Sequence, residues 1–152
     1  MPDRAVLGFA MEELQSIVYV SSAVRLFSAE EIRHLLDAAR KRNQEYGVTG
    51  VLLHCDGNFM QYIEGPSAGL DHVYGIICTD SKHRGMIEIM RAPIDRREFG
   101  EWSMAYRSPE ANGYSGSAQE QHLFGPVAQR HAMDASPSRL LLQNFWTRGL
   151  RH

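Results

Sequence analysis

VTGVLLHCDGNFMQYIE, residues 48–64, holds two apolar runs on either side of Asp56-Gly57. An Asp-Gly pair between two runs rich in β-formers is a strong signal for a hairpin with a tight turn. We therefore expect strands over Val48–Cys55 and Asn58–Glu64. This hairpin is the centre from which the rest of the fold can be built.

Gln61 is the polar exception in the second of these strands. Strand side chains alternate between faces, so Phe59, Gln61 and Ile63 share one face, and Met60, Tyr62 and Glu64 share the other. A buried polar group without a partner costs roughly 1–3 kcal/mol. The amide of Gln61 therefore needs a donor and an acceptor beside it, and identifying these is most of the functional problem.

The segments on either side of the hairpin show their own patterns. Ser28 and Glu31 form a capping box, which starts a helix that Gly47 closes. The inward stripe of this helix, Ile32, Leu35, Leu36 and Ala39, continues to Asn43. The other expected elements are a strand over Leu14–Ser22 with Ile17, Tyr19 and Ser21 on one face, a helix over Ser67–Asp80, a strand over Gly85–Arg91, a polar crossover over Pro93–Gly100, and a last strand over Trp102–Tyr106 with Trp102, Met104 and Tyr106 on one face.

The resulting order, β-α-β-β-α-β-β, predicts an α+β, ferredoxin-like sheet with one added strand. Both helices should lie on one face, and an apolar sheet needs cover on the other. Helices over Gly113–Met133 and after Ser136-Pro137 are the candidates for that cover, because the second carries a wide apolar stripe. We expect a flexible leader over residues 1–11, one domain over 12–108 and a C-terminal helical extension over 109–152. The apolar stripe of the helix after Ser136-Pro137 comprises Leu140, Leu141, Leu142, Phe145 and Trp146.

Composition narrows the function classes. The chain has 152 residues, 43% of them hydrophobic and 22% charged, which is typical of one globular domain. A net charge of −2 offers no basic field for nucleic acid or anionic lipid. Neither the two cysteines nor the seven histidines have the spacing of a metal site. Without a signal peptide or an apolar run of about 20 residues, we expect a cytoplasmic protein that binds no membrane.

Three predicted inward positions carry hydrogen-bonding groups, namely Tyr19, Asn43 and Gln61, and Asp80 and His83 end the second helix nearby. Taken singly, each is more often structural, since a buried tyrosine usually bonds a carbonyl and an asparagine near a helix end is usually a cap. Together they line the groove between two helices and the sheet. Amide side chains there complement a planar ligand with carbonyl and imide edges, such as an isoalloxazine ring.

The same residues resemble the motifs of BLUF domains, the blue-light sensors that use flavin. The resemblance runs from Leu14 to Tyr106 and rests on five stretches of sequence. These are IVYVSS with Tyr19, RKRNQEYGVTG with Asn43, GNFMQYIEG with Gln61, TDSKHRG with Asp80 and His83, and FGEWSMAY with Trp102 and Met104.

The resemblance implies a role for each of these residues. Tyr19 would donate an electron and a proton to the photoexcited flavin, and Gln61 would bridge Tyr19 and the flavin N5/C4=O edge. Asn43 would hold the carbonyl and N3 side of the flavin ring, and Trp102 or Met104 would move when the signalling state forms. The remaining cofactor contacts that it implies are Arg42 and Lys82, with Asp80 and His83, at the ribityl and phosphate part, and Phe59 and Leu35 as walls of the ring.

By the same resemblance the cofactor would be FAD, with FMN or riboflavin as alternatives. The protein would be a light sensor and not an enzyme. After illumination the amide of Gln61 would rotate or tautomerise and leave the flavin chemically unchanged. The signal would pass through the last strand and the C-terminal helices to a separate partner protein, with a homo-oligomer expected.

Two other readings of the residues stay open. A ferredoxin-like fold also suits a small acyl-phosphatase-like enzyme, although Ser21–Arg25 after the first strand holds no glycine for a phosphate cradle. The second alternative is a regulatory or dimerisation module without a chromophore, whose polar residues satisfy one another. The colour of the purified protein separates this module from a flavin sensor.

Overall fold

The strands form one sheet in the order β4-β1-β3-β2-β5 in the computed structural model of the chain, which describes residues 13–100, 102–108 and 136–149. β1 lies between β4 and β3 and is antiparallel to both, while β5 is parallel to β2 at the far edge. The elements are β1 (Leu14–Ala23), α2 (Ala29–Tyr46), β2 (Thr49–Cys55), β3 (Asn58–Pro66), α3 (Ser67–Cys78), β4 (His83–Ile94), β5 (Ala105–Arg107) and α5 (Pro137–Gly149).

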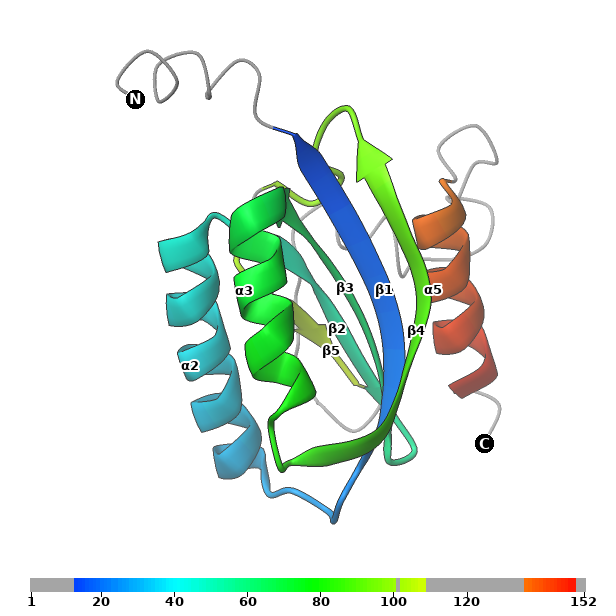
Figure 1. Ribbon diagram of the computed structural model, residues 1–152. Helices are drawn as coiled ribbons and strands as arrows, with labels where there is room; N and C mark the ends of the chain where they lie inside the picture. Colours follow the sequence, from blue (N-terminus) through cyan, green and yellow to red (C-terminus); the bar gives the residue numbers. More distant parts are fainter. Residues whose placement is uncertain (1–12, 101, 109–135, 150–152) are drawn as a thin grey trace.

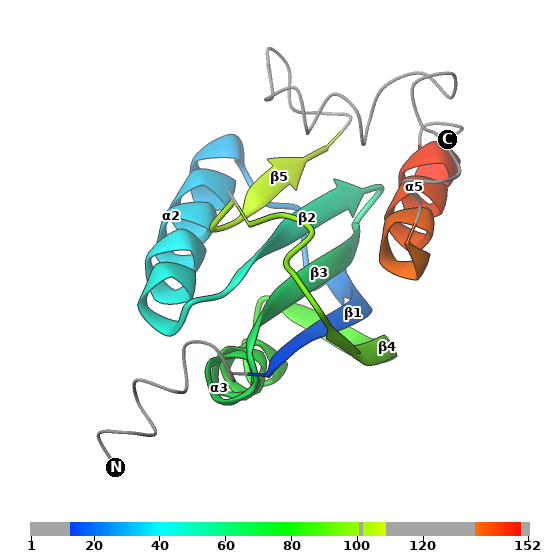
Figure 2. The same ribbon diagram turned by 90° about the horizontal axis from the view of Figure 1, so that it is seen from above.

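Helices cover both faces of this sheet. α2 and α3 lie side by side on one face and α5 lies on the other, as the two views in Figures 1 and 2 show. Each face has its own apolar core, because side chains of one strand alternate between the two. Ile17 and Ile63 belong to the core beneath α2 and α3, and Val18 and Tyr62 to the core beneath α5. The predicted ferredoxin-like α+β architecture is confirmed.

Local signals place the ends of the elements around the site. Ser28 Oγ accepts from Glu31 N and Glu31 Oε1 accepts from Ser28 N, so the predicted capping box is present. Gly47 ends α2 with φ of 71°, and Asp56 and Gly57 have φ of 55° and 80°, as a type I′ hairpin turn requires.

α5 begins as the sequence predicts and covers the second sheet face. Ser136 Oγ accepts from Arg139 N at 3.1 Å, with Pro137 as the first helical residue. Leu142 and Trp146 are buried against the sheet, whereas Leu140 is 53% exposed. The helix predicted over Gly113–Met133 lies outside the described residues, as does the leader over 1–11.

The last strand differs from the prediction. β5 covers only Ala105–Arg107, and the backbone bends at Ser103, so Trp102 and Met104 are not strand residues. Trp102 lies in the core beneath α5, and Met104 lies in the core beneath α2 and α3. The prediction that Trp102, Met104 and Tyr106 share one face was wrong, because strand alternation does not apply across this bend.

Within the described part of the chain, no helix is both long enough and apolar enough to cross a bilayer.

Candidate flavin site

A cavity of about 220 Å³ lies between α2, α3 and the sheet, far above the roughly 10–15 Å³ that a water molecule needs. Nine of the eleven residues predicted from the sequence line it, and the two others, Asn43 and Trp102, do not. The nine are Tyr19, Leu35, Arg42, Phe59, Gln61, Asp80, Lys82, His83 and Met104.

Tyr19, Gln61 and Met104 form a hydrogen-bonded chain at the floor of the cavity. Tyr19 on β1 and Gln61 on β3 are direct cross-strand neighbours. The Tyr19 hydroxyl donates to Gln61 Oε1, and Gln61 Nε2 donates to Met104 Sδ at 3.3 Å. Tyr19 and Gln61 are each 4% exposed, so both ends of the Gln61 amide are engaged out of water. This answers the question that the sequence raised about the partners of Gln61.

The phenol of Tyr19 is held in its protonated form. Burial raises the pKa of Tyr19 far above its ordinary value, and the positive charge of Arg42 opposes that rise without cancelling it. Burial in turn lowers the pKa of Arg42. At neutral pH the Tyr19 proton is therefore available for donation along the bond to Gln61.

Four buried polar atoms around this site have no hydrogen-bond partner among the described residues. They are Ser21 Oγ, Arg42 Nε, Asn43 Oδ1 and His83 Nδ1. His83 Nε2 lies 2.8 Å from the Ile77 carbonyl oxygen, so Nε2 carries the hydrogen and a neutral ring leaves Nδ1 as an acceptor. Buried polar groups are rarely left unpaired, so this set indicates a ligand with polar edges.

Asn43 does not line the cavity but holds the segment that carries Met104. Its side chain is fully buried, and Nδ2 donates to the Ser103 carbonyl at 2.7 Å. Oδ1 is left unpaired. Asn43 therefore anchors the residue next to Met104, and its Oδ1 is an acceptor without a partner among the described residues.

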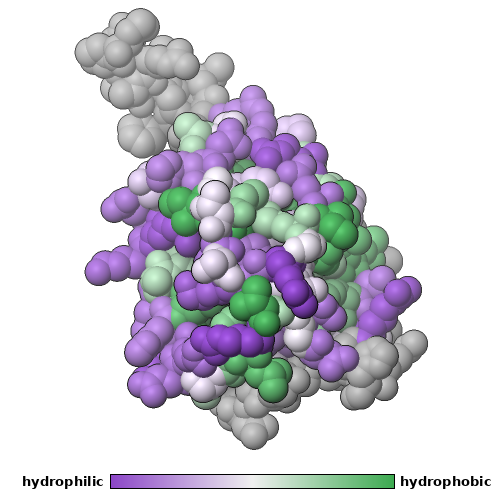
Figure 3. All heavy atoms as spheres, turned by 60° about the horizontal axis from the view of Figure 1, so that its bottom comes forward, coloured by the Kyte–Doolittle hydropathy of each residue, from purple (hydrophilic) through white to green (hydrophobic). Residues whose placement is uncertain are grey.

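Charged residues stand where the cavity meets solvent. Asp80 Oδ1 accepts from Lys82 N at 2.9 Å and lies 3.5 Å from Lys82 Nζ, whose side chain is 54% exposed. Figure 3 brings this end of the molecule forward, where hydrophilic side chains surround smaller hydrophobic areas. The surroundings of the entrance thus combine charge with apolar surface.

Trp102 lies on the opposite side of the sheet from the cavity. Its ring stacks on Phe99 with centroids 5.2 Å apart and an interplanar angle of 14°. Sequence reasoning also missed several lining residues: Ser21, Ala38, Ala39, Leu52 and Ile77. A usable signal was present for two of them, because adjacent alanines on an inward helix face leave room that longer side chains would fill.

The unpaired atoms fit a flavin. The ring of a flavin offers carbonyl oxygens and one imide N–H along one edge. Among the unpaired atoms of cavity-lining residues are Arg42 Nε as a donor and His83 Nδ1 as an acceptor, and Asn43 Oδ1 is an acceptor on the residue next to Arg42. The apolar side chains of Phe59 and Leu35 line the same cavity.

Comparisons with known proteins point the same way. Residues 14–105 match the family described as BLUF, sensors of blue-light using FAD. The chain is 31% identical over 98 residues to the photoactivated adenylate cyclase subunit beta of Euglena longa, covering 64% of this chain and 11% of that protein. It is 30% identical over 91 residues to the blue light- and temperature-regulated antirepressor BluF of Escherichia coli K12, covering 60% of this chain and 23% of that protein. The chain therefore spans about a tenth of the cyclase and about a quarter of the antirepressor.

Solved structures show the same relation. The dark state of the BLUF protein BlrB matches with a TM-score of 0.66 and 28% identity, covering 93% of this chain and 99% of that one. Klebsiella pneumoniae BlrP1, in a manganese and cyclic diGMP complex, matches with a TM-score of 0.71 and 26% identity, covering 90% of this chain and 33% of that one. With the family match spanning more than half of its residues, this chain belongs to the BLUF family of flavin-based blue-light sensors.

Proposed function

We propose that this chain binds FAD in the cavity between α2, α3 and the sheet, and that its light response starts at Tyr19, Gln61 and Met104. The observation that supports this most is the buried chain from the Tyr19 hydroxyl through the Gln61 amide to Met104 Sδ, set among four unpaired polar atoms. The two other readings of the sequence, an acyl-phosphatase-like enzyme and a module without chromophore, are not favoured by membership of a flavin-binding family.

A bound flavin would supply absorption of blue light and an electron acceptor beside Tyr19. Tyr19 holds its proton on the hydroxyl oxygen and directs it at Gln61 Oε1. Loss of an electron from the phenol to the flavin would make this proton acidic, so that it would follow the electron through Gln61 toward the flavin. The electron and the proton would both return to Tyr19 when the charges recombine. Rotation of the Gln61 side chain about its terminal torsion, or tautomerisation of its amide, then reverses the direction of bonding at Tyr19.

Other residues would hold the cofactor without taking part in this exchange. Asn43 and Arg42 would engage the polar edge of the ring, and Phe59 and Leu35 would pack against its faces. Lys82, with Asp80 and His83, would meet the ribityl and phosphate part near the entrance. We name FAD because the family is described by its use of FAD, and FMN and riboflavin stay as alternatives because BlrP1 is also known in complex with FMN.

The output is proposed to pass through a separate partner. In the related cyclase and antirepressor, the matched segment is a small part of a much longer protein. For this chain we propose a light sensor without catalytic activity of its own, cytoplasmic and homo-oligomeric, that acts on another protein. The division into a flavin domain over 12–108 and an extension over 109–152 belongs to the same proposal.

The absorption spectrum of the purified protein tests the proposed flavin binding and light response. Expressed with added flavin, the protein should be yellow, release FAD on denaturation, and show a small red shift after blue light that reverses in the dark. Ala38→Trp should abolish flavin binding, because Ala38 lines the cavity. Lys41→Trp, at an exposed position of the same helix outside the cavity, should bind normally. A colourless wild-type protein would contradict the proposal and favour the module without chromophore.

A further inference from the structure

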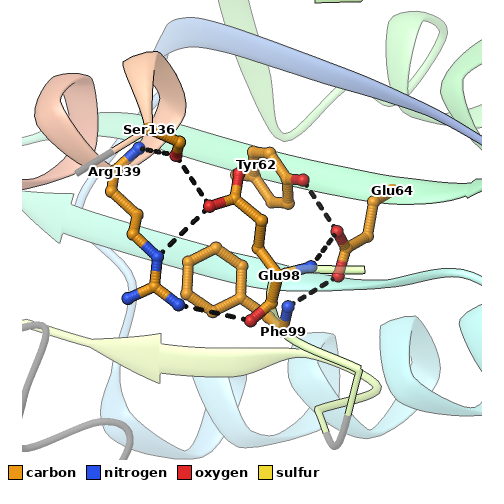
Figure 4. Close-up of polar contacts among 6 residues, drawn as sticks. All are labelled: Tyr62, Glu64, Glu98, Phe99, Ser136 and Arg139. Atoms are coloured by element: carbon orange, nitrogen blue, oxygen red, sulfur yellow. Dashed lines mark hydrogen bonds and ion pairs between the residues drawn. The ribbon is translucent and has the colours of Figure 1, made fainter. Parts of the chain in front are cut away.

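Glu64 is a fully buried carboxylate on the α5 face of β3, and it receives four hydrogen bonds. Oε1 accepts from the Tyr62 hydroxyl and from Glu98 N, both at 2.7 Å. Oε2 accepts from Thr49 Oγ1 at 2.9 Å and from Phe99 N at 2.8 Å. Figure 4 shows how this side chain binds two consecutive backbone amides of the β4–β5 crossover. Glu64 therefore fixes the crossover to the sheet.

The first turn of α5 is bonded to the same point of the crossover (Figure 4). Glu98 Oε1 accepts from Ser136 Oγ at 2.7 Å and from Arg139 Nε at 3.2 Å, and the Glu98 carbonyl accepts from Arg139 Nη2 at 3.4 Å. The Arg139 guanidinium also lies 4.9 Å from the centroid of the Phe99 ring. Only 14% of the Arg139 side chain and 19% of the Glu98 side chain are exposed, so solvent screens this pair far less than a surface pair.

The crossover continues to the floor of the cavity. Phe99 stacks on Trp102, whose carbonyl accepts from Gly50 N at 3.0 Å. Two residues further on, Met104 accepts from the Gln61 amide, and its carbonyl accepts from Arg40 Nε at 2.9 Å. One short segment is thus bonded to α5 near its start and to Gln61 at its end.

We propose that Glu98 and Arg139 form a latch that holds α5 on the sheet, that Glu64 positions the latch, and that movement of Met104 after illumination opens it. Met104 follows closely on the Phe99–Trp102 stack, so a shift of Met104 would pull on this stack and on the two bonds from Arg139 to Glu98. The light-driven part rests on the proposed function. The part concerning the dark state does not, because it follows from contacts that are present without light.

Hydrogen exchange of the full chain in the dark tests the latch. Arg139→Gln and Glu98→Gln should each raise amide exchange in α5 about tenfold or more, because each removes charge-assisted bonds. Exchange in α3 should not change. Arg91→Gln, which removes an exposed ion pair with Asp71, is the matched control and should leave α5 as in the wild type. The double variant should exceed neither single variant, since both act on one contact.

Glu64→Gln tests the positioning role. It keeps the size of the side chain but turns an –NH₂ group toward a backbone N–H donor. Exchange in α5 should rise as in Arg139→Gln although Arg139 is intact. If this variant does not fold, Glu98→Gln alone decides whether the contact between Glu98 and Arg139 holds α5 on the sheet. Wild-type exchange in α5 of a folded Glu64→Gln or Arg139→Gln variant overturns the proposal.

Illumination adds a second comparison. Wild-type α5 should exchange faster in light, approaching the level of Arg139→Gln, whereas Arg139→Gln should show no further rise and keep its red shift. A normal red shift with unchanged α5 exchange in the wild type overturns the light-driven part. Absence of any red shift in the wild type means that the proposed function fails, and the dark comparison still decides on the latch.

Discussion

The two ends of the Gln61 amide are bonded with unequal strength. The oxygen accepts from a phenol, whereas the nitrogen donates to a thioether, which is a weak acceptor. Turning the amide therefore gives up one weak bond and exchanges the roles on the strong one. This asymmetry makes a polar residue in an apolar strand suitable as a switch between two bonding patterns.

Gln61→Leu removes both bonds while keeping a side chain of similar size. We expect this variant to bind flavin and to lose the light-induced red shift completely. The Tyr19 hydroxyl would also lose its acceptor, so the free energy of unfolding of the apoprotein should fall by up to about 1–3 kcal/mol. Difference spectra and urea denaturation measure the two effects, and a normal red shift would contradict the role given to the amide.

Tyr19→Phe removes the proton donor and leaves the ring in place. This variant should also lose the red shift, because no phenol proton remains to move along the bond to Gln61. Tyr74→Phe is the matched control, since the two tyrosine rings lie 5.9 Å apart and Tyr74 does not line the cavity. We expect a normal red shift in the control. An intact photocycle in Tyr19→Phe would show that another residue serves as the donor.

At the scale of elements, local signals were sufficient for the hairpin and for α2. The capping box at Ser28, the left-handed Gly47 and the Asp56-Gly57 turn each act within a few residues, so the sequence contains the whole cause. The inward positions of Tyr19 and Gln61 followed from strand alternation in the same way.

The course of residues 97–100 and 102–104 could not be predicted, because distant residues fix it. Gly50, Asn43 and Arg40 each bond to one carbonyl between Trp102 and Met104, and Glu64 binds two amides before them. No periodicity in the sequence records such partners. For this reason Trp102 was placed on the wrong face, and the network around Glu64 was missed.

Two glycines of α3 give opposite predictions for the same substitution. A Cβ on Gly69 would lie 2.3 Å from the Tyr46 carbonyl at the end of α2, whereas a Cβ on Gly75 meets nothing within 4 Å. Gly75→Ala should raise the free energy of unfolding by about 0.5–1 kcal/mol through helix propensity. Gly69→Ala should lower it, because the two helices must separate. Urea denaturation of both variants checks this, and equal effects would contradict the close approach of α2 and α3.

At the scale of the molecule, the described residues form two apolar cores on opposite faces of one sheet, and each core buries a tyrosine. Tyr19 lies in the core beneath α2 and α3, and Tyr62 in the core beneath α5. Burial raises the pKa of Tyr19, and burial together with the charge of Glu64 raises the pKa of Tyr62. Since the two residues share no direct contact, their contributions to stability should add.

Alkaline pH should therefore destabilise the fold through both tyrosines. Above about pH 10 a tyrosine in the unfolded chain loses its proton while these two keep theirs, so the unfolded state binds fewer protons and stability falls as pH rises. The slope that each contributes should rise toward about 1.4 kcal/mol per pH unit as the pH increases above this value. Urea denaturation at several pH values between about 10 and 11.5 should show a slope reduced by this amount in Tyr62→Phe, and by twice this amount in the double variant with Tyr19→Phe. A slope that stays at the wild-type value in Tyr62→Phe would mean that this phenol ionises without unfolding.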